Sequence, residues 1–252
     1  MRLADFDYHL PEERIAQSPI EPRDAARLLV DRGSAAPEHR RVSDLPDLLR
    51  EGDLLVLNDT KVIPARLRLS RVSGGAVEVL LLEPLDEERR RWEALVRPAR
   101  KLRVGEQLVS GQGTPIVEVG RRTIAGDTVE VEVLAAGDTL ELLAQVGEMP
   151  LPPYITTRLG DPSRYQTVYA EHPGSAAAPT AGLHLTARLL DELRSRGVRT
   201  ARVELVVGLD TFKPVSVDNP TQHAMHSERY RVPAETLAVH CVLGGVVDRH
   251  RL

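Results

Sequence analysis

A change of hydrophobic period near residue 66 constrains the fold of this 252-residue chain more than any other feature. From there to about Leu134, short runs such as AVEVLLLE, RWEALVR and TVEVEVL mostly alternate apolar with polar side chains. Glycine-containing breaks separate these runs. Alternation with such breaks is typical of antiparallel strands that bury one face. This block therefore predicts a small barrel or sandwich built from a meander of strands.

Around this block the sequence predicts a different architecture, in which helices and strands alternate. Helices are expected over residues 10–17, 43–52, 138–147 and 186–197, and strands over residues 53–58 and 198–208. The run 53–58 is apolar, which favours a strand buried on both faces. The sequence therefore predicts an α/β domain with an inserted all-β, barrel-like domain. The expected boundaries are 1–64 and 148–252 for the α/β domain and 65–147 for the insertion, with the proline-rich stretch 148–158 crossing between them.

Composition narrows the class of protein. Hydrophobic residues make up 42% of the chain and its net charge is −4, so it is not an overall basic nucleic-acid binder, although a local basic face stays possible. The lone Cys241 can form neither an internal disulfide nor a cysteine zinc cluster, which favours a reducing compartment. We find no signal-peptide pattern and no apolar run of membrane length. We therefore expect a cytoplasmic protein with no membrane partner, and a monomer, since no assembly motif is present.

Small side chains dominate the stretch GSAAAPTAGLHLT, residues 174–186. Such a run lets another group approach the backbone closely. His184 stands at its end, directly before the expected helix 186–197, whose first N–H groups could bind a carboxylate. Two interpretations remain open from the residues alone: a ligand loop with an acid–base histidine, or tight packing around a core histidine.

Further candidates stand at the ends of the two expected strands. Polar side chains follow each strand, where open α/β sheets bind ligands, although simple polar turns are an alternative: Asn58, Asp59 and Lys61 after the first, Asp210, Thr211 and Lys213 after the second. Tyr165 and Tyr169 could face a cation, stack on a base or pack in the core. The segment HAMHSE, residues 223–228, has a spacing that metal ligands could use, but no P-C-x-x-C accompanies it, so we expect no metal.

Five motifs together resemble one family. NDTKVIPARL, PLPPYI, YQTVYAEHPGSAAAPTAGLHLT, VGLDTFKPV and HAMHSERY occur in the order found in the S-adenosylmethionine:tRNA ribosyltransferase-isomerases of queuosine biosynthesis. The resemblance runs from residue 1 to about residue 237. It departs mildly at Leu185, where the family more often has phenylalanine. After Ala238 the sequence is unlike the family, which could reflect a truncated or frameshifted end.

The resemblance implies a reaction, a fold and a set of site residues. The family transfers and isomerises the ribosyl part of S-adenosylmethionine, a co-substrate, onto 7-aminomethyl-7-deazaguanine in a tRNA anticodon, with no prosthetic group, and its fold is an α/β domain with an inserted barrel. His184, His226 and Glu228 are the candidate acid–base groups. The candidate substrate contacts are Asn58, Asp59, Lys61, Tyr165, Tyr169, Ser175, Thr180, Gly182, Asp210, Thr211 and Lys213. A relative that only binds S-adenosylmethionine or tRNA, and a metal-dependent enzyme built on HAMHSE, are the alternatives.

A basic strip offers a place for tRNA. Residues 89–103, RRRWEALVRPARKLR, carry many arginines and lysines and a single glutamate. Most charge runs are solvated faces, and that interpretation stays open. Because phosphate contacts are largely electrostatic, we expect a phosphate track here, made by Arg97, Arg100, Lys101 and Arg103.

Overall fold

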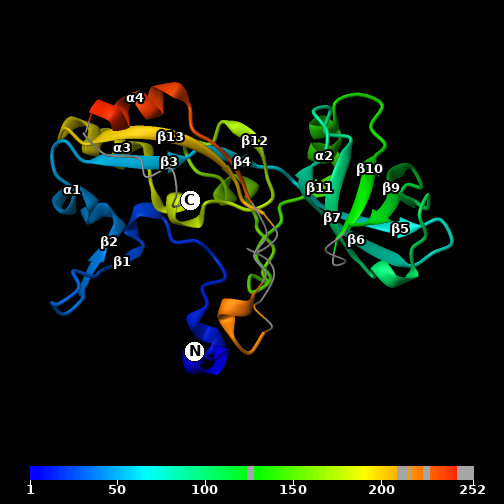
Figure 1. The fold of residues 1–252 in the computed structure, drawn as a ribbon, viewed down its shortest axis with the longest axis horizontal. Helices are drawn as coiled ribbons and strands as arrows, with labels where there is room; N and C mark the ends of the chain where they lie inside the picture. The colour runs from blue at the N-terminus through cyan, green and yellow to red at the C-terminus, as the bar shows by residue number, and fades with distance from the viewer. Residues whose placement is uncertain (124–127, 209–214, 216, 224–227, 243–252) are drawn as a thin grey trace.

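The computed structural model describes residues 1–123, 128–208, 215, 217–223 and 228–242, and of residues 239–242 only the backbone. A β-barrel and a layered α/β part lie next to each other, and the chain enters and leaves the barrel on the side that faces the α/β part (Figure 1). The fold class predicted from the sequence, an α/β domain with an inserted barrel-like domain, is therefore confirmed. The exact boundaries at residues 64–65 and 147–148 stay a prediction.

Six antiparallel strands form the barrel. They are β5 (Arg66–Arg71), β6 (Ala76–Pro84), β7 (Arg91–Arg97), β8 (Gln107–Val109), β9 (Pro115–Arg122) and β10 (Val129–Val133). The strand order is β5-β6-β7-β10-β9-β8, and β8 pairs back to β5, so the sheet closes on itself. Because the sheet is closed, its six strands present no unpaired edge to solvent. Backbone pairing between the strands can therefore stabilise a short β block.

The barrel interior follows from the alternation in the sequence. In β7, for example, Trp92, Ala94 and Val96 are buried while the residues at both strand ends are exposed. Helix α2 (Thr139–Val146) packs Leu143 into the same core, and β11 (Gly147–Glu148) follows it at once and pairs with β5. As the sequence predicts, the Asp138 carboxylate caps α2 by accepting hydrogen bonds from its first N–H groups.

The α/β part contains three small sheets. Strands β3 (Leu54–Asn58) and β13 (Arg199–Val206) are parallel, and β14 (Arg229–Arg231) runs antiparallel to β13. Strand β4 (Thr60–Val62) pairs in parallel with β12 (His172–Ser175), and β1 (Arg27–Val30) forms a hairpin with β2 (Glu38–Arg41). Because β3 leads directly into β4, these short sheets bring the polar residues after β3 next to β12 and β13.

Among the described residues, three α-helices accompany these sheets: α1 (Leu45–Leu48), α3 (Ala187–Ser195) and α4 (Ala234–Val242). The Thr186 hydroxyl caps α3 by accepting a hydrogen bond from the N–H of Leu189. The leucine face of α3 packs against β3 and Val198, as an amphipathic helix requires. Helix α4 lies against β13, where the Thr236 hydroxyl donates to the carbonyl of Arg202 at 2.6 Å. Short 3-10 turns occupy Leu3–Phe6, Glu12–Arg14, Arg23–Ala25, Val42–Asp44, Ala99–Lys101, Pro162–Tyr165, Thr180–His184 and Pro220–Gln222.

Three local expectations are wrong. Residues 10–17 contain only the 3-10 turn Glu12–Arg14, because the following Gln17 side chain is hydrogen-bonded to the distant segment at 154–157. The helix expected over 43–52 is the 3-10 turn followed by the four-residue α1. Strand β3 is not buried throughout, since Val56 is 51% exposed on the face that α3 does not cover.

Candidate functional site

The polar turn after β3 is built around Asn58. Its Nδ2 donates to the carbonyl of Leu205 at 2.9 Å, while its Oδ1 accepts from the Leu205 N–H at 3.1 Å and from the Thr60 hydroxyl at 2.9 Å. Asn58, a predicted substrate contact, therefore joins the end of β3 to β13. Both the oxygen and the nitrogen of its side-chain amide are hydrogen-bonded within the protein. Lys61, three residues after β3 ends, is exposed on β4.

A buried carboxylate follows at Asp59, whose side chain is only 4% exposed. Its Oδ1 lies 3.3 Å from Nδ1 of His172, and its Oδ2 lies 4.0 Å from Nη1 of Arg202, which also pairs with Glu171. Among the described residues, no donor makes a well-aligned hydrogen bond to Asp59 Oδ1. A buried acceptor with unused capacity is costly unless a ligand or water engages it, so Asp59 is a strong site candidate.

The sequence alone does not single out His172 and Arg202. His172 belongs to the motif YAEHPG, and Arg202 is one of three charged residues in the strand RTARVELV. Both features are visible in the sequence. Their meeting at Asp59 depends on the parallel pairing of β4 with β12 and of β3 with β13, which residue spacing cannot give.

Tyr169 explains part of the small-residue stretch. A Cβ added at Gly182 would lie 2.2 Å from the Tyr169 hydroxyl oxygen and 3.2 Å from Cγ2 of Thr167. Gly182 is therefore the residue type that lets this tyrosine approach the backbone. Burial raises the pKa of the Tyr169 phenol to about 12, with the negative charge of Asp59 as a further cause. Tyr169 and Asp59, two predicted substrate contacts, thus act on each other electrostatically.

We expect Gly182→Ala to disturb this packing. The added methyl group must displace the Tyr169 ring, and overpacking of this kind costs about 1–3 kcal/mol. Thermal unfolding of the variant should show a lower midpoint than that of Gly160→Ala, a matched control whose added Cβ meets no atom within 4 Å. Equal midpoints for the two variants would contradict the close approach.

The raised pKa of Tyr169 has a consequence for stability at high pH. The folded state keeps the phenolic proton up to about pH 12, whereas the unfolded chain releases it near its ordinary value of about 10. Between these two pKa values the unfolded state binds fewer protons than the folded state. The stabilisation is therefore fully present below pH 10, and the free energy of unfolding falls by roughly 1.4 kcal/mol per pH unit from there to about pH 12. Urea unfolding between pH 9 and 12 should show this extra loss in the parent chain and not in Tyr169→Phe; parallel curves would contradict it.

Three alanines of the stretch, Ala176, Ala177 and Ala178, are buried together with Ser175. The Ser175 hydroxyl donates to the carbonyl of Ala177 at 2.7 Å and accepts from the N–H of Val207 at 3.1 Å. Ser175 therefore fixes the chain just after β13. Tyr165 packs against Val62 and Ala178 in a small apolar cluster, and burial raises the pKa of its phenol. Its surroundings fit the core-packing alternative.

His184 is the last residue of the 3-10 turn that begins at Thr180. Thr180 itself is exposed. The ring is half-buried, and its Nδ1 lies 3.2 Å from the carbonyl oxygen of Ala181. A proton on Nδ1 would be held by that carbonyl, which would leave Nε2 as the basic nitrogen. At the start of α3, the buried Asp24 carboxylate accepts from Thr186 and from Arg188, so the chain itself supplies a carboxylate near this helix start.

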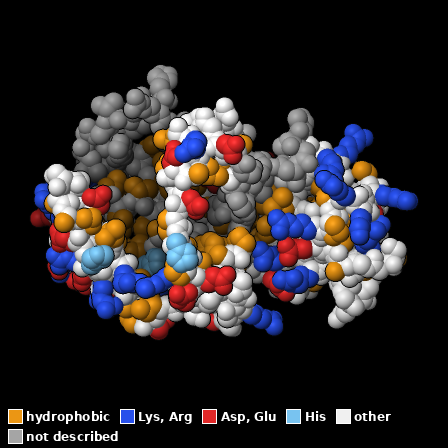
Figure 2. All heavy atoms as spheres, turned by 90° about the horizontal axis from the view of Figure 1, so that it is seen from below, with side chains coloured by type: hydrophobic (Ala, Val, Ile, Leu, Met, Phe, Trp, Pro, Cys, Tyr) orange, Lys and Arg blue, Asp and Glu red, His pale blue; other side chains and the backbone are white. Residues whose placement is uncertain are grey.

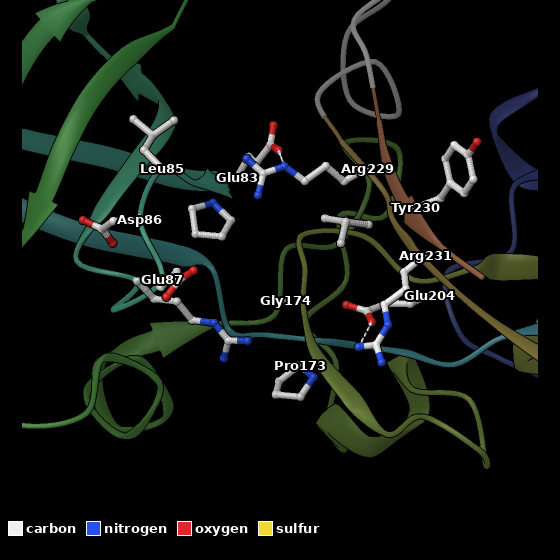
Figure 3. Close-up of a pocket in the computed structure, with 13 residues that line it drawn as sticks. Glu83, Leu85, Asp86, Glu87, Pro173, Gly174, Glu204, Arg229, Tyr230 and Arg231 are labelled. Carbon is white, nitrogen blue, oxygen red and sulfur yellow. Dashed lines mark ion pairs between the residues drawn. The ribbon is translucent and has the colours of Figure 1, made fainter. Parts of the chain in front are cut away.

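Glu228 accepts a hydrogen bond from the N–H of Gly208 at 2.9 Å. The next residue, Arg229, lines a cleft of about 470 Å³ between the β6–β7 turn of the barrel and strands β12, β13 and β14 (Figure 3). Two ion pairs line this cleft: Arg229 with Glu83 of the barrel at 2.5 Å, and Arg231 with Glu204 at 3.8 Å. The cleft is therefore charged. Ser175 and Glu228 bind the consecutive N–H groups of Val207 and Gly208, which follow β13.

Several predicted residues cannot be placed. His226, Asp210, Thr211 and Lys213 lie outside the described residues. Within the described part of the chain, no three histidine, cysteine or acidic side chains converge as a metal site would require. A search of those same residues finds no helix that is both long and apolar enough to cross a membrane.

The basic strip lies on the barrel. Arg97 ends β7, and Arg100, Lys101 and Arg103 follow it, all exposed. Lys and Arg side chains, blue in Figure 2, are spread over the barrel end of the molecule. The strip is thus available to a partner, as a phosphate track requires.

Comparison with known proteins identifies the family of this chain. The family model described as "Queuosine biosynthesis protein" matches residues 3–240. An S-adenosylmethionine:tRNA ribosyltransferase-isomerase of Symbiobacterium thermophilum is 57% identical over 94% of this chain and 70% of its own length, and one of Moorella thermoacetica is 53% identical over 92% and 68%. The crystal structure of a Thermotoga maritima S-adenosylmethionine tRNA ribosyltransferase is 32% identical, with a TM-score of 0.39, and the match spans 95% of this chain and 65% of that one.

The resemblance seen in the five motifs is thereby confirmed over nearly all of the described residues. The chain belongs to the queuosine biosynthesis family, a family of S-adenosylmethionine:tRNA ribosyltransferase-isomerase enzymes.

Proposed function

We propose that this chain transfers and isomerises the ribosyl moiety of S-adenosylmethionine onto 7-aminomethyl-7-deazaguanine in a tRNA anticodon, with release of adenine and methionine. The observation that carries the proposal is the family match across residues 3–240, which includes all five motifs. The product of this reaction is epoxyqueuosine in the tRNA. The reaction is a displacement with proton transfers, so the proposal includes no prosthetic group.

The chemistry assigns work to a small number of side chains. A proton must leave the carbon next to the sulfonium, the departing adenine needs a proton, and the attacking amine must be neutral. His184, His226 and Glu228 are the proposed acid–base groups. Asp59 and Tyr169 suit the cationic sulfonium, because a buried carboxylate oxygen without a well-aligned donor and an aromatic ring both favour positive charge.

The remaining predicted contacts divide between the substrate and the fold. Asn58, Ser175 and Gly182 support the site through backbone contacts and close packing. Lys61 and Thr180 are exposed near it and are proposed to contact substrate directly, as are Asp210, Thr211 and Lys213. Arg97, Arg100, Lys101 and Arg103 are proposed to bind tRNA phosphates. We propose a monomer in the cytoplasm, because tRNA is the substrate and all proposed groups come from one chain.

The proposal is tested by incubating the purified chain with S-adenosylmethionine and a tRNA that carries the aminomethyl-deazaguanine base. Chromatography should detect adenine and methionine in equal amounts, and both should depend on the tRNA. Formation of S-adenosylhomocysteine would instead indicate methyl transfer and contradict the proposal. Binding of both substrates with neither product released would favour the alternative of a binding-only relative.

A further inference from the structure

A second cavity, of about 690 Å³, lies at the corner where α2 meets β11 and is separate from the charged cleft. Strand β5 supplies Arg66 and Arg68 to its lining, and the segment after β11 supplies the opposite wall, which includes Thr156 and Arg158. Gln17 fixes that wall, because its Oε1 accepts from the N–H of Thr156 at 2.8 Å and its Nε2 donates to the carbonyl of Tyr154 at 2.9 Å. The cavity is thus a built feature of the fold.

The charges that line this cavity do not balance. Arg68 pairs with Glu148 at 3.0 Å, the single acidic residue of the lining. Within the described part of the chain, neither Arg66 nor Arg158 has a carboxylate partner. Arg66 Nη2 donates to the carbonyl of Leu151 at 3.1 Å, but its Nε is buried and has no acceptor there. The guanidinium groups of Arg66, Arg68 and Arg158 face one carboxylate, that of Glu148, so the lining carries a net positive charge that favours an anion.

The cavity and the basic strip share one face of the barrel. The strand register sets Arg68 of β5 opposite Glu78 of β6, and sets Glu78 opposite Arg97 of β7. Residues paired in this way point to the same face of a sheet, with Cβ atoms about 5 Å apart. Arg97, the first residue of the proposed phosphate track, and Arg68 of the cavity therefore stand on either side of Glu78 in one row on the outside of the barrel, and Glu78 lies 3.8 Å from Arg68.

We propose that this cavity binds a phosphodiester group of the tRNA and extends the track of the basic strip, an inference that rests on the proposed function. Guanidinium groups bind phosphate oxygens through two parallel N–H donors, and Arg66 and Arg158 have donors to spare. The carboxylate of S-adenosylmethionine shares this oxyanion chemistry. The position of the cavity on the same barrel face as the strip favours the phosphodiester, because a nucleic-acid backbone bound along Arg97 and Arg100 can reach Arg68 and the cavity, whereas a free amino acid group gains nothing from the strip.

The test is equilibrium binding of tRNA, measured by fluorescence anisotropy over a range of KCl concentrations. Arg158→Gln and Arg68→Gln should each weaken binding and lower the slope of log affinity against log salt by about 0.7–0.9, the value for one phosphate contact. Arg100→Gln in the strip should do the same. Arg194→Gln, on the exposed face of α3, is the matched control and should leave the slope unchanged.

The possible outcomes separate this inference from the proposed function. If Arg100→Gln lowers the slope while Arg158→Gln and Arg68→Gln do not, the cavity holds no phosphate and the inference is overturned, although the function stands. If those two variants instead weaken binding of S-adenosylmethionine alone, the cavity takes its carboxylate and the phosphodiester assignment is wrong. If the parent chain shows no salt-dependent tRNA binding, the proposed function itself fails.

Discussion

Replacing Gly147 by alanine is expected to lower the thermal unfolding midpoint more than the same exchange at Gly182 or Gly160. Gly147 ends α2 and begins β11 without an intervening residue, and its N–H donates to the carbonyl of Leu143. An added Cβ would lie 2.0 Å from the carbonyl oxygen of Pro64 and 2.7 Å from that of Leu143. Both are backbone atoms, so no side-chain rotation relieves the collision. The corner at which the chain leaves the barrel would have to open.

We expect a loss of about 3 kcal/mol, the upper end of what overpacking usually costs. For a chain of this size that corresponds to a midpoint lower by roughly 6–12 °C, measured by circular dichroism. Gly137→Ala is the matched control, since it flanks the other end of α2 and its Cβ would meet no atom within 4 Å. A Gly147→Ala midpoint equal to that of Gly137→Ala would contradict the geometry of this corner.

The barrel could be predicted from the sequence because its signals are local. Alternation in the run of β7 places Trp92 inward directly, and Asp138 caps α2 through its own neighbours. The leucines of α3 are spaced for one face in the same way. Each of these features depends on residues a few positions apart, which a linear sequence displays.

Other features depend on contacts between distant segments, and the sequence alone does not predict them. Residues 10–17 have a helix-like composition, yet Gln17 takes its hydrogen bonds from a segment some 140 residues later. Strand β3 reads as buried on both faces, but Val56 is exposed because α3 covers one face only. Local propensity is weak compared with such tertiary contacts.

The candidate site shows the same division. Polar residues at strand ends can be read as site candidates from the sequence, since the edge of a parallel pair is a property of the fold class, and Asp59 is one of them. The pairing of Asp59 with His172 and Arg202 spans three strands and could not be read from spacing. Residue type also cannot tell a ligand contact from an internal one. Asn58 and Ser175 look alike as candidates, yet both bind the backbone around the end of β13.

Replacing His184 by alanine is expected to have the largest effect on catalysis. The ring is held by the 3-10 turn that precedes α3, with Nδ1 3.2 Å from the Ala181 carbonyl. If Nδ1 carries its proton toward that carbonyl, Nε2 is the nitrogen that would exchange a proton with the substrate in the proposed reaction. Removing a general acid or base usually lowers turnover by about 10²–10⁴-fold. Because proton transfer belongs to the transition state, KM for S-adenosylmethionine should change far less than kcat.

The measurement is steady-state turnover of His184→Ala with deazaguanine-bearing tRNA, followed by the release of adenine. His39→Ala is the matched control, since His39 is exposed on β2, in a hairpin that supplies none of the proposed site residues. The control should keep the parent kcat, and both variants should unfold at the parent midpoint. Added imidazole should restore part of the lost rate if His184 transfers a proton, because a small base can occupy the space of the missing ring. A lower midpoint without rescue would assign His184 to packing, and an unchanged kcat would remove it from the chemistry altogether.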